Sequence, residues 1–249
     1  MTSQSATLVT RRSAIEAEHI ELGARWLADD IHWPAGYGEA VATATGAAVA
    51  LGAGLAEIGP LDELLLRGPG ALAAAATHAT GGAGGGATGG ATTTVGRAVA
   101  ADLLGEPGAI WLLGPDEVLL LAPSGGSALR TLASDLATDD VSAIEMTGSR
   151  TSLRLAGPAA PAILSELCPA NTTPAAMAQG DLVQAPLGGV RAFIARQDAG
   201  AQPGYTIMVA RDEAAYVWEI LRRVGAPHGL APVGPAAVSG VAAASGGSS

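Results

Sequence analysis

The sequence feature that most constrains the fold is an internal repeat. The segments LLLRGPGALAAAA (64–76) and LRLAGPAAPAILSEL (153–167) each place an alternating strand before a Gly-Pro turn and a helix. A second pair of segments, 118–137 and 205–225, joins a strand through a short polar turn to an amphipathic helix. Both pairs recur at a separation of about 88 residues, so the chain is predicted to consist of two related halves.

Each half supplies a strand and a helix, then a strand or hairpin, then another strand and helix. This order is the split βαβ pattern of ferredoxin-like units. In the second half the hairpin is visible in residues 180–196, with Gly188-Gly189 at its turn. The repeat equates Leu120 with Met208. The sequence therefore predicts an α+β fold of two ferredoxin-like (split βαβ) subdomains.

The predicted halves are residues 12–138 and 139–235. The first half contains THATGGAGGGATGGATTT (77–94), which has almost no side chains that can pack and is interpreted as a flexible loop. The last residues, 236–249, end in SGVAAASGGSS and are predicted to be a disordered tail.

A capping-box pattern marks the first helix, because Ser13 is followed by Glu16 three residues on. The apolar positions at helical spacing extend this predicted helix to Leu27. An ordered loop over 28–38 and a second helix over 39–51 are expected to follow.

The charge balance excludes several kinds of chemistry and partner. All 13 basic residues are arginine, so no lysine can form a Schiff base or act as the phosphate-binding lysine of a P-loop. The net charge of −10 repels nucleic-acid backbones and anionic lipid. We therefore expect no nucleic-acid partner and no membrane partner.

The cysteine count and the N-terminus indicate a cytoplasmic protein. The one cysteine, Cys168, cannot form an internal disulfide and is interpreted as a buried small hydrophobe. No apolar run reaches the roughly 18 residues of a membrane span. The pair Arg11-Arg12 precedes an acidic helix in place of the apolar run of an export signal.

Several stretches resemble a known family, the folate-binding domain of the glycine-cleavage T-protein aminomethyltransferases. These stretches are residues 23–38, 54–71, 187–209 and 225–234. Residues 113–123 and 153–169 are also similar to the small gamma subunit of heterotetrameric sarcosine oxidase, a truncated member of the same superfamily. The resemblance covers about residues 12–235. It implies two ferredoxin-like subdomains around a central cleft that holds tetrahydrofolate in the family, without the family's C-terminal barrel.

The chain departs from the family pattern at polar positions of that cleft. Where the family has an aspartate that orients folate, an ungapped comparison gives Glu106, whereas aligning the turn GEPG removes the acid; we favour the second alignment. Thr206 stands where the family has a pterin-binding glutamate, Val238 replaces an arginine, and Leu61 replaces a methionine. Each lost buried partner costs about 1–3 kcal/mol. The cofactor is thus unknown: tetrahydrofolate is implied by the resemblance but is expected to bind weakly.

With only eight aromatic residues of the Phe, Trp and Tyr types, few side chains are available to fill the cleft. We therefore expect an open, largely apolar pocket for a ligand less polar than folate.

Three residues are candidates for catalysis: His32, Glu57 and Glu106. His32 lies near Asp29 and Asp30 and is either a tuned acid or base or a loop histidine bonded to backbone. Glu57 has a counterpart, Glu145, in the other half. Two carboxylates facing one cleft would divide acid and base work, although the repeat alone also accounts for their symmetry.

Arg150, before a strand, is either an anion clamp or a solvated arginine. The expected ligand-binding residues are Trp33, Tyr37, Leu61, Glu145, Arg150, Arg196, Tyr205 and Thr206. No metal site is expected, because the histidines at 19, 32, 78 and 228 lack ligand spacing.

Two functions fit these observations. The first is a diverged aminomethyltransferase-family enzyme, which uses the folate cleft for one-carbon transfer or for a repurposed reaction on a less polar small molecule. The second is a non-catalytic subunit like the sarcosine oxidase gamma subunit. The expected partners are accordingly a small-molecule ligand and either a partner subunit or a second copy in a homodimer.

Overall fold

The computed structural model describes residues 11–28, 31–37, 52–81 and 94–239. The predicted second helix at 39–51 lies outside the described residues. Most of the predicted loop at 77–94 also lies outside the described residues. Its described first residues, 77–81, complete one helix and form one short strand.

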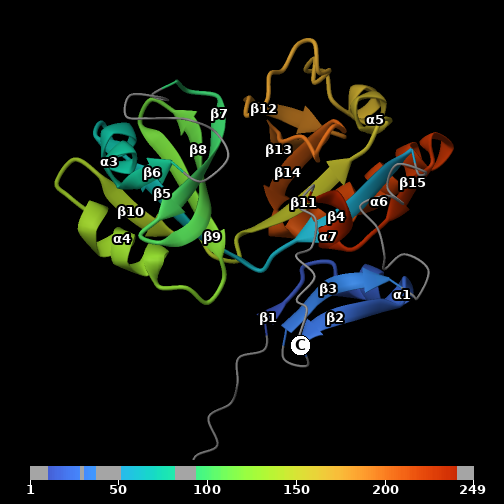
Figure 1. Ribbon diagram of the computed structural model, residues 1–249, viewed down its shortest axis with the longest axis horizontal. Helices are drawn as coiled ribbons and strands as arrows, with labels where there is room; N and C mark the ends of the chain where they lie inside the picture. The colour runs from blue at the N-terminus through green and yellow to red at the C-terminus, as the bar shows by residue number, and fades with distance from the viewer. Residues whose placement is uncertain (1–10, 29–30, 38–51, 82–93, 240–249) are drawn as a thin grey trace, which may run out of the picture.

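Strands in two six-stranded sheets and one small sheet make up most of the fold (Figure 1). The first sheet has the order β10-β5-β9-β8-β7-β6, the second sheet has the order β12-β13-β14-β11-β4-β15, and the small sheet has the order β1-β3-β2. The strands are β1 (Arg11–Arg12), β2 (Ala24–Ala28), β3 (Ile31–Tyr37), β4 (Ala53–Ile58), β5 (Leu61–Arg67), β6 (Ala79–Gly81), β7 (Arg97–Leu103), β8 (Glu106–Gly114), β9 (Glu117–Pro123), β10 (Ser142–Glu145), β11 (Arg150–Ala156), β12 (Leu182–Leu187), β13 (Val190–Arg196), β14 (Gly204–Ala210) and β15 (Leu230–Pro232).

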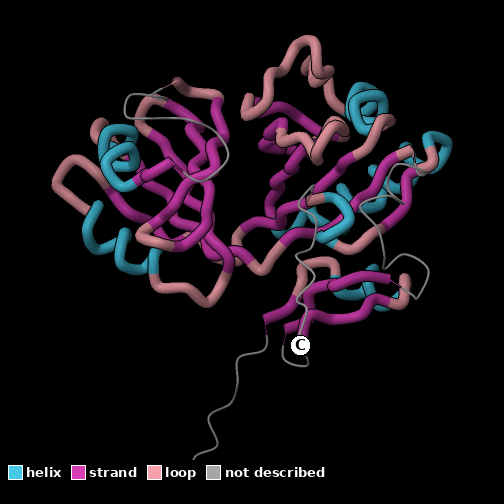
Figure 2. Tube along the Cα trace, viewed as in Figure 1, coloured by secondary structure: helices cyan, strands magenta, loops and turns pink. Residues whose placement is uncertain are grey.

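Each large sheet carries helices on one face, and we call the first sheet with α3 and α4 the first unit and the second sheet with α5 and α6 the second unit (Figures 1 and 2). The helices are α1 (Glu16–Glu21), α3 (Ala71–His78), α4 (Ala128–Leu136), α5 (Ala160–Leu167), α6 (Ala214–Gly225) and α7 (Pro235–Val238), with 3-10 turns η1 (Arg211–Glu213) and η2 (Ala226–His228). Separate apolar cores lie between each sheet and its helices. The mixed α/β content predicted from the repeat is therefore present.

The repeated Gly-Pro turns adopt the same conformation. Gly68 and Gly157 both have φ +135°, a value that favours glycine. The Gly68 amide donates to the Asp116 carbonyl, and the Gly157 amide donates to the Pro203 carbonyl, each at 2.9 Å. A methyl group on either glycine would collide with the backbone of a neighbouring strand or its lead-in segment. The turns thus close both units in the same way.

The two halves exchange one strand, which the repeat did not reveal. Strand β4 comes from the first half but pairs antiparallel with β11 of the second sheet. Strand β10 comes from the second half but pairs antiparallel with β5 of the first sheet. The two six-stranded sheets therefore do not follow the predicted boundary between 138 and 139.

The strand register corrects one predicted equivalence. Leu64 and Leu153 each stand four residues before the glycine of their turn. Leu64 is paired with Leu120, whereas Leu153 is paired with Ile207. The counterpart of Leu120 is therefore Ile207. The predicted equivalence with Met208 is wrong by one residue, and the Met208 side chain points to the opposite face of its sheet.

The N-terminal segment, residues 11–37, differs from its prediction. The helix ends at Glu21, and Leu27 lies in strand β2. The predicted loop at 28–38 contains strand β3, the central strand of the small sheet, which is paired with β1 on one side and β2 on the other. Gly23, with φ +67°, turns the chain from α1 into β2. The alternation of apolar and polar residues in these short strands was too brief to distinguish from a helix.

The start of the predicted tail is also ordered. Residues 235–238 form α7, and Val238 is fully buried against β4 and β11. Residues 240–249 lie outside the described residues.

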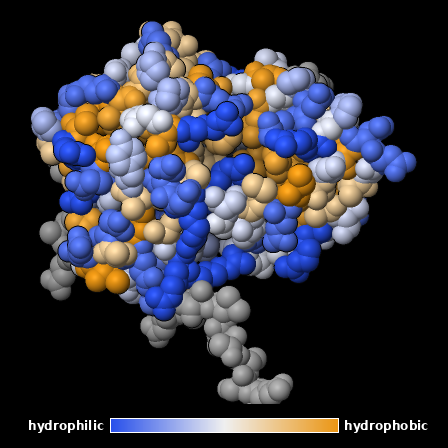
Figure 3. All heavy atoms as spheres, turned by 180° about the vertical axis from the view of Figure 1, so that it is seen from behind, coloured by the Kyte–Doolittle hydropathy of each residue, from blue (hydrophilic) through white to orange (hydrophobic). Residues whose placement is uncertain are grey.

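On the face shown in Figure 3, hydrophobic residues form separate patches among hydrophilic ones, as is usual for a water-exposed surface. Within the described ranges, no helix is long and apolar enough to cross a membrane.

Candidate functional site

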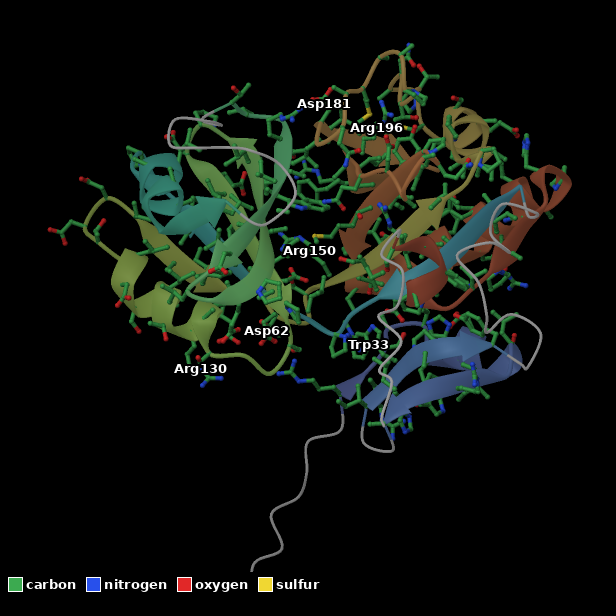
Figure 4. The ribbon with its side chains drawn as sticks, in the orientation of Figure 1. Trp33, Asp62, Arg130, Arg150, Asp181 and Arg196 are labelled. Atoms are coloured by element: carbon green, nitrogen blue, oxygen red, sulfur yellow. The ribbon has the colours of Figure 1, made fainter. Side chains whose placement is uncertain are left out.

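Four of the predicted site residues meet at one small pocket, which we call the junction pocket. Trp33, Glu57, Leu61 and Arg150 line it, and they come from β3, β4, β5 and β11 (Figure 4 labels two of them). The other lining residues are Ile58, Glu63, Gly148, Thr151, Ser152 and Arg211. Its volume is about 30 Å³, which is room for about one water molecule.

Arg150 is paired with a carboxylate that the sequence analysis did not select. Its Nη1 donates to Glu63 Oε2 at 3.0 Å, and its guanidinium lies 5.7 Å from the centre of the Phe193 ring. Glu63 is only 3% exposed. Burial raises the pKa of Glu63, and the hydrogen bond and charge of Arg150 oppose that rise. The Arg150 charge is therefore already compensated within the protein.

A signal for Glu63 was present in the sequence. In the strand LDELLLR, Glu63 lies on the same face as Leu65, whose side chain packs between the two large sheets. An acid on a buried strand face requires a partner, and Arg150 provides it.

Glu57 is the centre of a buried hydrogen-bond chain. Ser13 Oγ donates to Glu57 Oε2 at 2.5 Å, His19 Nε2 donates to the same oxygen at 2.8 Å, and Tyr37 Oη donates to His19 Nδ1 at 2.7 Å. The His19 ring also contacts the Trp218 ring edge-on, with centroids 5.2 Å apart. Burial, and then the Glu57 carboxylate, raise the pKa of Tyr37 above its ordinary range.

This chain of groups resembles a catalytic relay in its chemistry, because a histidine is oriented by a carboxylate on one side and a hydroxyl on the other. Every member is buried, however, and both ring nitrogens of His19 are already bonded. The arrangement therefore fastens the N-terminal segment to the second unit. His19 was not selected from the sequence, since only the tertiary structure brings it to Glu57.

His32 lies outside the junction pocket. Its Nδ1 is 2.5 Å from Glu16 Oε1, and its ring stacks on Trp26 with centroids 5.1 Å apart. Because side chains alternate along β3, Trp33 faces the pocket while His32 faces the other side. The expected partners Asp29 and Asp30 lie outside the described residues.

Glu106 caps a helix. Its Oε1 accepts hydrogen bonds from the backbone amides of Ser127 at 2.9 Å and Ala128 at 3.3 Å, at the N-terminus of α4. A carboxylate at this end of a helix is favoured by the unpaired amides and the helix dipole. The geometry assigns Glu106 a capping role and separates it from the junction pocket.

Arg196 and Tyr205 make structural contacts in the second sheet. Arg196 binds Asp198 with two hydrogen bonds of 3.0 and 2.7 Å. Tyr205 Oη donates to the Thr172 carbonyl at 2.6 Å, and burial raises the pKa of Tyr205 to about 12. Neither side chain lines the junction pocket.

Thr206 belongs to a separate cluster around Arg154. Thr206 Oγ1 donates to Gln197 Oε1 at 2.7 Å and accepts from Arg154 Nη1 at 3.3 Å. Arg154 Nε donates to the Val238 carbonyl at 3.2 Å. Burial lowers the pKa of Arg154 to about 10. Thr206 and the backbone of Val238 are thus both bonded to this buried arginine.

The space between the two large sheets is filled by apolar side chains. Trp111, Leu119 and Leu121 of the first sheet pack against Met208 and Phe193 of the second. Trp111, Leu119 and Met208 are buried almost completely. The expectation of an open, largely apolar pocket is wrong for this region, because leucine and methionine supply the bulk that the few aromatic residues could not.

The junction pocket does not fit tetrahydrofolate. A ligand of that size needs a cavity of roughly 300 Å³ or more, whereas the junction pocket has about 30 Å³. The two positions that could have offered an acid, Glu106 and Thr206, are bonded elsewhere.

The described part of the chain holds no cluster of three or more His, Cys, Asp or Glu side chains that could bind a metal. Cys168 is buried in the second unit, as predicted. His228 forms a surface pair with Glu166 at 2.6 Å.

Comparisons with known proteins agree on one superfamily. The family model described as the GCVT N-terminal domain matches residues 15–243. The gamma subunit of sarcosine oxidase from Arthrobacter sp is 32% identical over 99 residues, which is 40% of this chain and 48% of that protein. The gamma subunit from Corynebacterium sp. (strain P-1) is 38% identical over 68 residues, 27% of this chain and 34% of that protein. These matched stretches thus span half or less of the curated relatives.

Two solved structures are similar over a larger part of the chain. A chain of heterotetrameric sarcosine oxidase from Corynebacterium sp. U-96, in complex with pyrrole 2-carboxylate, has 25% identity and a TM-score of 0.57, covering 71% of this chain and 85% of that one. Aminomethyltransferase T of the glycine cleavage system from Bartonella henselae has 20% identity and a TM-score of 0.72, covering 92% of this chain and 62% of that one. The second likeness concerns the fold alone.

Proposed function

The chain belongs to the family of the GCVT N-terminal domain, and from this premise we propose that it is a non-catalytic subunit of the sarcosine oxidase gamma type. Such a subunit would complete an oxidase assembly without supplying the redox chemistry. Its partner would be a larger subunit of the same assembly.

The observation that carries this proposal is the filled space between the two large sheets. An enzyme of this fold needs a cleft there, and a cleft without its ligand would leave apolar cavity surface that costs stability. Here Trp111, Leu121 and Met208 occupy the space, and Glu106 is used to cap α4. The residues that a folate enzyme would use have become structural.

The finer architecture is part of the same proposal. We interpret the strand orders β10-β5-β9-β8 and β4-β11-β14-β13 as two ferredoxin-like subdomains. In each of them the strand written first, β10 or β4, is supplied by the other half of the chain. A protein of this kind with a net charge of −10 would work in the cytoplasm and would not bind nucleic acid or membrane.

One observation favours a second candidate, an enzyme acting on a ligand smaller and less polar than folate. Glu57, Glu63 and Arg150 converge on the junction pocket, and buried charged groups at a pocket are typical of functional sites. A panel of small carboxylates and amines in a thermal-shift assay tests it. Stabilisation that disappears in Arg150→Leu would support this enzyme, and no response would leave the subunit proposal standing.

Two measurements test the subunit proposal itself. The tagged full chain, purified from its own source cells, should elute at a native mass well above its 24.4 kDa together with a larger protein. Titration calorimetry of the isolated chain with tetrahydrofolate should give a Kd no tighter than about 100 µM. A monomer that binds tetrahydrofolate at low micromolar concentration would contradict the proposal and restore a one-carbon transferase.

A further inference from the structure

A second pocket lies beside α4, and we call it the α4 pocket. Its volume is about 110 Å³. It is lined by Arg11, Asp62, Glu63, Leu64, Gly126, Leu129, Arg130, Ala133, Glu145 and Thr147. These residues come from β1, β5, β10, α4 and the adjoining turns. Figure 4 shows Asp62 and Arg130 in the lower part of the first unit.

The strand register identifies the counterpart of this pocket in the second unit. Glu145 of β10 is paired with Leu64, and Glu57 of β4 is paired with Leu153. Because the two leucines hold equivalent places before their Gly-Pro turns, Glu145 and Glu57 are equivalent as well. The α4 pocket therefore corresponds to the site beside α6 that surrounds Glu57.

In the second unit that site is occupied by the N-terminal segment. Ile15 is fully buried in the core with Leu153 and Trp218. His19, four residues later and one turn along α1, bonds to Glu57. One aliphatic side chain and one hydrogen-bond donor at helical spacing thus close the site.

In the first unit the corresponding carboxylate is open. Glu145 is exposed, and its side chain makes no hydrogen bond or ion pair with another described residue. The same holds for Arg130. The other charged side chains of the pocket already have partners: Arg11 is bonded to Asp62 at 3.0 Å, and Glu63 to Arg150. One carboxylate and one guanidinium are left for an external ligand.

The neighbouring sheet edge is open too. In the second sheet β4 is flanked by β15, which pairs with it in parallel. In the first sheet β10 is an edge strand among the described residues. An open sheet edge is a common place for another chain to dock.

We propose that the α4 pocket binds a short helix of a partner protein. That helix places an aliphatic side chain against Leu64 and Leu129, a hydrogen-bond donor such as histidine or arginine on Glu145, and an acid within reach of Arg130. This proposed contact between two chains would be equivalent to the contact that α1 makes with the second unit within one chain. The inference rests on the proposed function only in requiring that a partner chain exists.

Photo-crosslinking of the full chain tests this docking site. The tagged protein is expressed in its source cells with p-benzoylphenylalanine in place of Ala133, which lines the pocket. A matched control variant carries p-benzoylphenylalanine in place of Asp135, which is exposed on α4 outside the pocket lining. We expect an adduct with one larger protein at position 133 and none at 135. The crosslinked peptide, identified by mass spectrometry, should be helical in that partner. Adding Glu145→Ala should lower the yield at least about fivefold, the effect of losing a charged hydrogen bond.

The other outcomes overturn the proposal. An adduct with residues 1–10 of the same chain, or with a second copy, would assign the pocket to a different occupant. A chain that co-purifies with a larger protein but gives no adduct at position 133 would refute the docking site and leave the subunit proposal intact. A monomer without any adduct would refute both.

Discussion

The two units have the same strand order around their central strands, yet they differ in how the equivalent acidic residue is treated. In the second unit Glu57 is 1% exposed and bonded to Ser13 and His19. In the first unit Glu145 is exposed at an open pocket. The difference arises because the N-terminal segment buries the acid of the second unit and leaves the acid of the first unit exposed. A repeat in the sequence therefore does not make the two sites alike when a segment outside the repeat completes one of them.

Replacing the equivalent acid of each unit in turn should give the largest difference in stability between the two units. Glu57→Ala leaves His19 and Ser13 buried without their acceptor and should lower the free energy of unfolding by about 3–5 kcal/mol. Glu145→Ala should change it by less than about 0.5 kcal/mol, since the side chain is exposed. Urea denaturation of both variants measures the contrast. Equal effects would mean that the α4 pocket is occupied in the isolated chain.

Substitution of the turn glycines should instead show the units to be alike. Gly68→Ala and Gly157→Ala both force a side chain into φ +135° and into contact with backbone atoms at 2.0 and 2.8 Å. Each should cost about 2–3 kcal/mol. Gly105→Ala is the control, because it has positive φ but open space around it, and it should cost about 1 kcal/mol. A difference of more than about 1 kcal/mol between the two turns would break the equivalence.

Helix capping distinguishes the units by a smaller amount. Helix α4 is capped by Glu106 from strand β8, whereas α6 has no side-chain cap. Glu106→Ala should therefore lower the free energy of unfolding by about 1 kcal/mol. Asp135→Ala, at an exposed position of the same helix, should change it by less than about 0.5 kcal/mol. Unchanged thermal stability of Glu106→Ala would argue against the capping role.

The smallest expected effect is a pH dependence at the boundary between the units. Burial raises the pKa of Glu63, so the folded protein holds its proton to higher pH than the unfolded chain does. The contribution of this group is therefore fully present below its unfolded pKa and is lost as the pH rises through the folded pKa. The measured quantity is the free energy of unfolding of the natural protein minus that of the Glu63→Gln variant. This difference should fall as the pH rises above 4.5. Denaturation series at several pH values measure this difference, and a constant or rising difference would show that Arg150 outweighs burial.

Local patterns predicted some elements well and others poorly. The strand, Gly-Pro turn and helix of each repeat, and the hairpin at Gly188-Gly189, depend on neighbouring residues and were predicted correctly. The segment after Ser13 was predicted as one long helix, but it divides into α1 and β2. Its residues gain more by pairing with β3 than by continuing the helix, and such pairing cannot be read from the segment alone.

The candidate site was predicted only in part, for a related reason. Of the expected site residues, Trp33, Glu57, Leu61 and Arg150 meet at the junction pocket, whereas Glu106 and His32 lie elsewhere. Residue type identifies a group that can do chemistry. It does not reveal which partner will satisfy that group.

The sequence by itself determined the repeated strand-turn-helix units and the exclusion of lysine chemistry, because these follow from spacing along the chain and from composition. The family was indicated by the resemblance of several stretches to its members. Only the tertiary structure decided the exchange of β4 and β10, the Tyr37–His19–Glu57 chain and the filled space between the sheets. Each of these joins residues far apart in the sequence. Their stability comes from burial of polar groups with their partners and from the fit of side chains across an interface, which depend on the whole fold.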